Sequence, residues 1–220
     1  ILITYVQRLF NGKSSFRLDN NGIKIGTIVL DDSHACIDSI RNAFSIRANR
    51  QSEIYKHFIT LFEDSMRGQG EGTYMDIKNS DTSYELMTVP YWDWIDKQDE
   101  VVEFMNKQQE NDDVKFAYPL LKDIWSDCTV YFTGREMEII PNYNLIHRFT
   151  SFTRADQRVF MSATTQDDSF FIKGLMVDEK AVTHPLTNAS TNWSGEKMIL
   201  FPTRIDTSLN SEIMREFVCK

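Results

Sequence analysis

The 220-residue sequence contains few of the features that mark secreted, fibrous or membrane-spanning proteins. Its three cysteines, Cys36, Cys128 and Cys219, form neither a disulfide framework nor a CxxC metal pair, so we expect a reducing, cytoplasmic location. Nine glycines and five prolines are too few for a collagen-like or low-complexity chain. No apolar run approaches the roughly 20 residues that cross a bilayer, so we expect no membrane partner.

Acidic residues outnumber basic ones by 32 to 24, which gives a net charge of −8. A surface with this excess of acid does not bind nucleic acid through charge alone, because phosphate contacts need clustered Lys and Arg. One basic grouping is present: Arg41, Arg47, Arg50 and Lys56. This grouping fits either a phosphate contact or a solvated helix face.

Strand-like segments alternate with helical ones, which indicates an α/β fold with a mainly parallel sheet. Residues 23–30 (IKIGTIVL) are almost all apolar, as in a strand buried on both faces. Residues 1–4 predict another buried strand. Because the chain begins inside that strand without an initiator Met, we expect an internal segment of a longer protein. Residues 128–132 and 137–140 predict two strands around a turn at Thr133-Gly134.

Between these strands, apolar residues recur at helical spacing. Two such stripes predict amphipathic helices. They consist of Ile37, Ile40 and Phe44, and of Ile54, Phe58, Ile59, Phe62 and Met66. Further along, Tyr91, Trp92 and Trp94 follow Pro90 and fit either base stacking or packing in a core.

Two acidic residues come directly after the strand at 23–30, in the sequence Asp31-Asp32-Ser33-His34. A parallel strand delivers the residues past its carboxyl end into the crevice where α/β sheets bind ligands. One carboxylate there can hold Mg²⁺, and the other can activate a water for attack on a phosphate. The same residues also suit a helix cap, since Asp and Ser are good N-caps.

A second short strand, at residues 158–161, ends in Ser162-Ala163-Thr164. By itself this is an ordinary strand exit with hydroxyl side chains. Together, the two segments resemble motifs II and III of superfamily 2 helicases, the DEAD/DEAH-box-like ATPases. The first RecA-like domain of that family carries D-E-x-[DH] and S-A-T in this order. The resemblance covers residues 1–46 and 145–203.

The resemblance implies a RecA-like, P-loop NTPase-type domain made of residues 1–46 and 145–220, with a mainly parallel sheet. Residues 47–144 match no family motif and are expected to form a largely helical insertion. The P-loop pattern G-x-x-x-x-G-K-[ST] is absent, and the glycine-rich run at 68–72 lacks its Lys and is interpreted as a flexible loop. We therefore expect an inactive internal fragment whose sheet lacks the P-loop strand. The strands on either side of that gap should either pair directly with each other or self-associate by pairing with a strand of another copy.

The resemblance also assigns roles residue by residue. Asp31 would hold the Mg²⁺ that accompanies ATP. Asp32, where most of the family has Glu, would activate the attacking water. His34 would couple the nucleotide state to the rest of the motor, and Ser162 and Thr164 would link hydrolysis to movement along DNA or RNA.

The residues themselves leave two other functions open. A carboxylate-metal phosphoesterase or nuclease would use Asp31, Asp32 and His34 directly. It would need further ligands, for which Asp167 and Asp168 are the nearest candidates. A non-catalytic interaction module built on the insertion is the third possibility. The other histidines have no spacing typical of a zinc site.

Overall fold

The computed structural model describes residues 1–82, 84–162 and 169–186. The chain divides into two compact units, Ile1–Thr183 and His184–Lys220. Every helix and strand described below belongs to the first unit. In the described residues, no helix has the length and apolar character needed to cross a membrane.

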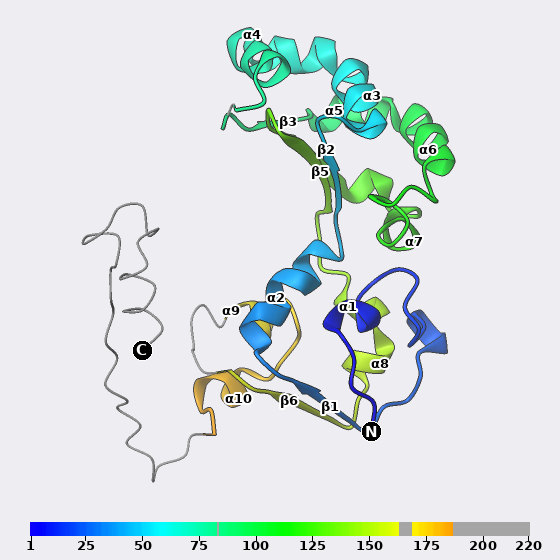
Figure 1. Ribbon diagram of the computed structural model, residues 1–220, viewed down its shortest axis with the longest axis vertical. Coiled ribbons are helices and arrows are strands. Elements are labelled where there is room, and N and C mark those ends of the chain that lie inside the picture. The colour runs from blue at the N-terminus through cyan, green and yellow to red at the C-terminus, as the bar shows by residue number, and fades with distance from the viewer. Residues whose placement is uncertain (83, 163–168, 187–220) are drawn as a thin grey trace, which may run out of the picture. The chain divides into compact units, whose positions relative to one another are not determined.

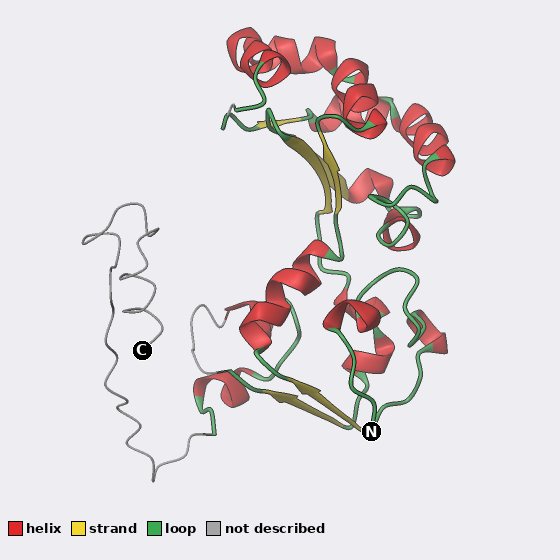
Figure 2. Cartoon of the chain, viewed as in Figure 1, coloured by secondary structure: helices red, strands yellow, loops and turns green. Residues whose placement is uncertain are grey.

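The described residues form a mixed α/β structure with two separate sheets (Figures 1 and 2). One sheet is parallel and pairs β1 with β6, and the other is antiparallel with strand order β2-β5-β4-β3. The expectation of a mainly parallel arrangement therefore holds only for the smaller sheet. The strands are β1 (Thr27–Leu30), β2 (Ile46–Asn49), β3 (Met87–Thr88), β4 (Cys128–Phe132), β5 (Glu136–Pro141) and β6 (Gln157–Phe160).

Short helices and one longer helix accompany the parallel sheet. The longer one, α2 (Ser33–Asn42), starts directly after β1 and buries Ile37 and Ile40, as the sequence periodicity predicts (Figure 1). The others are α1 (Val6–Leu9), α8 (Thr150–Thr153), α9 (Ser169–Lys173) and α10 (Glu179–Thr183), with 3-10 turns η1 (Asp19–Asn21) and η3 (Ile146–Arg148).

The span 47–144 contributes no strand to the parallel sheet among the described residues. Apart from Ile46, the first residue of β2, the whole antiparallel sheet lies within this span, together with the remaining helices. The predicted strands on both sides of Thr133-Gly134 are confirmed as β4 and β5. The helices are α3 (Glu53–Leu61), α4 (Glu63–Asn79), α5 (Tyr91–Asp96), α6 (Gln98–Lys107) and α7 (Tyr118–Leu121), with a 3-10 turn η2 (Trp125–Asp127).

Helix α3 shows how the sequence determines a local element. Its N-cap Ser52 accepts a hydrogen bond of 3.1 Å from the backbone N–H of Tyr55, which satisfies one of the unpaired donors of the first turn. The whole second stripe is buried, from Ile54 to Met66, which confirms the amphipathic prediction. Burial of apolar surface against the antiparallel sheet and helix α5 stabilises this packing.

Two strand predictions are wrong. Residues 1–4 form no strand and are exposed, because no described strand pairs with them. The strand predicted over 23–30 is limited to β1, and only its last residue, Leu30, is buried. Val29 remains 54% exposed, because among the described residues β1 pairs only with β6 and no layer covers that side chain. Apolar composition alone does not make a strand where a pairing partner is missing.

The glycine-rich run at 68–72 is not a loop, contrary to the sequence-based interpretation. It lies within α4, and only Gly70 departs from helical geometry, with φ −178° and ψ 95°. The helix kinks there and continues to Asn79 because flanking residues such as Met66 and Tyr74 are buried and anchor both halves.

Histidine His57 on α3 is a half-buried titratable group. Its ring stacks on Phe104 with centroids 3.7 Å apart, and its Nε2 is buried with no hydrogen-bond partner among the described residues. Burial lowers the pKa of His57 below its ordinary value, against the opposing influence of Glu100 and Glu53.

We therefore expect the free energy of unfolding to fall as the pH drops below about 6.5, where the unfolded chain binds a proton that the folded chain does not. Urea unfolding at pH 7.5 and pH 5.5 measures this. His57→Phe keeps a flat ring on Phe104 and should reduce the difference between the two pH values. His147→Gln, at an exposed histidine, is the control and should leave the difference unchanged. An equal pH dependence in His57→Phe would contradict the assignment.

Candidate functional site

The carboxyl ends of β1 and β6 lie side by side and present the predicted site residues (Figure 1). The register pairs Leu30 with Phe160, and the N–H of Met161 donates to the carbonyl of Leu30 at 2.9 Å. A second hydrogen bond joins the same two segments, because the N–H of Ser33 donates to the carbonyl of Met161 at 2.8 Å. Asp31 and Ser162, which follow these two strands, therefore lie at the same edge of the parallel sheet.

The acidic pair occupies the tight connection between β1 and α2. Asp32 has left-handed backbone geometry, φ 46° and ψ 57°, and is the N-cap residue of α2. Its N–H donates to Oδ1 of Asp31 at 3.0 Å, which orients that carboxylate. Both residues are exposed, so their carboxylates are accessible to a ligand from solvent. Asp is among the few non-glycine residues that adopt the left-handed region readily, which explains its presence at this turn.

His34 on the first turn of α2 connects the two strand ends. Its Nδ1 is hydrogen-bonded to Oγ of Ser162 at 2.6 Å, across 128 positions of sequence. The imidazole also packs edge-on against Phe171 of α9, with ring centroids 5.2 Å apart. Phe171 is buried and contacts Phe160 of β6, so β6 and α9 together fix the histidine ring.

Cys36 lies one turn along α2 and is a poor nucleophile. Its thiol donates to the carbonyl of Asp31 at 3.4 Å. Burial raises the pKa of the Cys36 thiol, and the nearby charges of Asp32 and Asp31 raise it further. Because the thiolate is the reactive form, a raised pKa disfavours a nucleophilic role for this thiol.

The donor set at the strand ends fits a water-rich magnesium ion better than a caged metal. Nowhere in residues 1–82, 84–162 and 169–186 do three or more His, Cys, Asp or Glu side chains gather to hold a metal. Mg²⁺ commonly keeps several waters and takes one or two carboxylates together with substrate phosphates, and Asp31 and Asp32 suit that role. Thr164, Asp167 and Asp168 lie outside the described residues, so their predicted roles stay predictions.

Three members of the basic grouping make contacts within the chain: Arg41 in the last turn of α2, Arg47 and Arg50. The guanidinium of Arg41 lies 4.4 Å from the centre of the Phe170 ring, and Arg47 pairs with Glu138 at 2.9 Å. Arg50 donates to backbone carbonyls. These contacts engage the three guanidinium groups within the chain, which counts against a dedicated phosphate-binding surface. Because Arg47 lies on β2 and Arg50 follows it, the grouping is not a single helix face either.

Sequence reasoning missed several contributors to this region. Phe171 orients His34, yet it follows the motif segments with no pattern that marks a contact with a histidine 137 positions earlier. A pocket bordered by α1 and α2 also had no signal in the sequence, because its wall includes Phe116 from the span 47–144. Only long-range packing brings these residues together.

Comparisons with protein-family models, with curated proteins and with solved structures found no match for this chain.

Proposed function

We propose that this chain supplies the ATP-hydrolysis and coupling segments of a superfamily 2 nucleic-acid helicase or translocase, on a RecA-like domain. The observation that carries the proposal is the hydrogen bond between His34 and Ser162. It joins the two motif segments at the carboxyl edge of the β1–β6 sheet, where α/β proteins bind ligands.

In this proposal the two acidic residues have different tasks. Asp31, oriented by the backbone of Asp32, is the carboxylate that holds a magnesium ion on the phosphates of ATP. When bound, magnesium would supply positive charge beside the phosphates. Asp32 orients and deprotonates the attacking water. The side chain of Asp32 is one methylene shorter than that of Glu, so its carboxylate must reach the attacking water from closer to the backbone. In this proposal the left-handed turn at Asp32 allows that closer approach.

In this proposal, the hydrogen bond between His34 and Ser162 couples the nucleotide state at Asp32 to the segment after β6. His34 follows Asp32 by two positions on a rigid first turn of α2, and Ser162 follows β6 directly. A displacement of Asp32 when the γ-phosphate leaves would therefore strain or release this bond and move the segment after β6. Thr164 continues that segment and is proposed to share the coupling role toward bound DNA or RNA.

The 220 residues lack the P-loop that cradles the phosphates, so the proposal assigns that part to other residues of the same polypeptide. The chain alone should bind Mg·ATP negligibly, because Asp31 and Asp32 repel phosphate and no Lys of a P-loop offsets them. An open reading frame around the codon of Ile1 that encodes no P-loop would count against the proposal.

A double-mutant cycle on His34 and Ser162 tests the coupling role. In the polypeptide that carries this segment with a P-loop, we expect His34→Ala and Ser162→Ala each to lower strand displacement per ATP by about tenfold, an interaction of about 1.4 kcal/mol. The double variant should be no worse than either single one. Basal ATP hydrolysis should change far less.

The control is His147→Ala, at an exposed histidine outside the site, which should behave as wild type. Additive losses in the double variant would show that the two side chains act independently and would contradict the coupling role.

A further inference from the structure

Helices α5 and α6 form one nearly continuous amphipathic segment. The N–H of Lys97, which lies between them, donates to the carbonyl of Asp93 at 3.1 Å. The N–H of Val101 in turn donates to the carbonyl of Lys97 at 3.0 Å, so the helical hydrogen bonds continue through the junction. One side of the segment is buried, and the apolar residues on it are Trp94, Val101 and Met105. The opposite side is left to solvent or to a partner.

The exposed side of this segment combines a large ring with carboxylates. Its residues recur at spacings of four, three and four positions, as along one side of a helix. They are Trp92, Asp96, Asp99 and Glu103, and together they define the α5–α6 face. Trp92 is 65% exposed, and the adjacent Tyr91 is 68% exposed. Exposed Trp and Tyr are typical of protein interfaces, because burial of such a ring contributes strongly to binding.

The charge around the α5–α6 face favours a cationic partner. Residues 47–144 contain 19 acidic and 10 basic residues, whereas the rest of the chain contains 13 and 14. In the part of the chain that the structure describes, Asp96 and Asp99 form no ion pair, and Glu103 pairs with Lys107 in an exposed contact that contributes little. An indole ring also attracts cations, because its face carries partial negative charge. Arginine and lysine side chains therefore complement both the carboxylates and the ring.

The spacing of these groups fits an extended partner segment. Trp92 and Glu103 are eleven positions apart, which corresponds to about 16 Å along the helix axis. In an extended chain, alternate side chains lie on the same side and are about 6.6 Å apart. About three cationic side chains at alternate positions therefore match the length of the α5–α6 face.

We propose that the α5–α6 face docks an extended segment of a partner protein that carries arginine or lysine at alternate positions. One cation of that segment lies over the Trp92 ring, and others pair with Asp96 and Asp99. This inference does not rest on the proposed ATPase function, since none of the motif residues belongs to the face. It assigns a role in protein binding to the span 47–144, which matches no helicase motif.

Equilibrium binding of fluorescein-labelled peptides to the purified 220-residue chain tests this. One peptide has five Arg-Ser repeats, and a second has five Glu-Ser repeats. In fluorescence anisotropy, we expect the arginine peptide to bind and the glutamate peptide not to bind. Trp92→Ala should weaken binding about fivefold, and Trp92→Leu nearly as much, because leucine has apolar bulk but no aromatic face. The double variant Asp96→Asn with Asp99→Asn should weaken it about tenfold.

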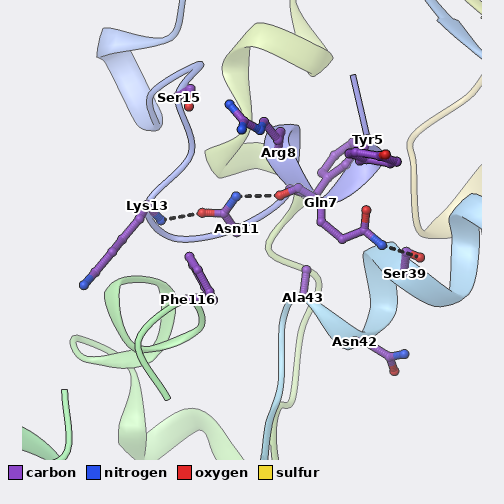
Figure 3. Close-up of a pocket in the computed structure, with 11 residues that line it drawn as sticks. Tyr5, Gln7, Arg8, Asn11, Lys13, Ser15, Ser39, Asn42, Ala43 and Phe116 are labelled. Atoms are coloured by element: carbon purple, nitrogen blue, oxygen red, sulfur yellow. Dashed lines mark hydrogen bonds between the residues drawn. The ribbon is translucent and has the colours of Figure 1, made fainter. Parts of the chain in front are cut away.

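Matched controls separate docking on this face from general attraction to an acidic protein. Asp64→Asn with Asp76→Asn removes the same charge from exposed positions on another helix, α4. Phe116→Ala removes another exposed ring, which lines the pocket beside α1 and α2 (Figure 3). Neither control should change affinity by more than about twofold at physiological salt, because distant charges are screened. Thermal melting of each variant checks folding.

The proposal is overturned if the arginine peptide does not bind, if the glutamate peptide binds equally well, or if the controls lose as much affinity as the variants of the face. Sedimentation of the chain without peptide tests a different occupant. A dimer that Trp92→Ala dissociates would show that a second copy covers the face and would also overturn the proposal. Asp32→Asn should leave peptide binding intact, so failure here is distinguishable from failure of the ATPase proposal.

Discussion

Asp32→Asn is expected to abolish ATP turnover in the polypeptide that carries this segment with a P-loop, with a loss on the order of 10³-fold. The substitution removes the carboxylate that we propose as the base that activates water. It retains a polar side chain of similar size, and Asn adopts the left-handed backbone of this turn as readily as Asp does. Affinity for Mg·ATP should therefore change little, because Asp31 remains in place.

Steady-state ATP hydrolysis and calorimetric titration with Mg·ATP measure the two quantities separately. Asp38→Asn is the matched control, since Asp38 is an exposed carboxylate on the same helix, within 4.0 Å of Arg41. It should leave turnover unchanged. Near-normal turnover by Asp32→Asn would show that another residue activates the water. A large loss of Mg·ATP affinity would place Asp32 on the metal instead.

The proximity of the two motif segments follows from the sequence more directly than the fold around them does. A strand followed by Asp31-Asp32-Ser33-His34 and a strand followed by Ser162 are local patterns, and parallel pairing brings such ends to one edge. Helical stripes such as Ile54 to Met66 are equally local, because the burial of one face follows from a 3.6-residue period.

Elements that depend on distant partners were not predictable. Strand β2 pairs with β5 across about 90 positions, and its sequence (IRAN) contains two polar residues that remain exposed. Residues 1–4 are more apolar than β2, yet they form no strand because no described neighbour pairs with them. Pairing decides between these two segments, and a single sequence does not display pairing.

The aromatic cluster after Pro90 illustrates the same limit within one helix. Trp94 is buried among Phe58 and Phe62, and its indole N–H donates to the carbonyl of Trp125 at 2.7 Å. Tyr91 and Trp92 are exposed. Base stacking and core packing were each assigned to the three aromatic residues together. The residues of one helical turn face different environments, so a single role does not fit all three.

Arg50 leads to the second large effect, on stability. Its guanidinium donates to the carbonyls of Ile77 and Lys78 at the end of α4 and, at 2.9 Å, to that of Gly134 in the turn between β4 and β5. One half-buried cation thus satisfies three backbone acceptors and interacts favourably with the negative end of the helix dipole. It also joins α4 to the antiparallel sheet at the end of β2.

Arg50→Ala should lower the free energy of unfolding by about 3 kcal/mol, because hydrogen bonds to a charged donor contribute about 1.5 to 3 kcal/mol each and water replaces part of the loss. Arg50→Lys should fall between Ala and wild type, since an ammonium group cannot reach the same acceptors with a planar fork. Urea unfolding followed by circular dichroism gives both values.

Arg47→Ala is the control three positions earlier. It removes an exposed ion pair to Glu138, for which we expect a loss below about 1 kcal/mol. If Arg50→Ala costs no more than Arg47→Ala, water replaces the guanidinium fully and the junction of α4 with the sheet does not depend on it.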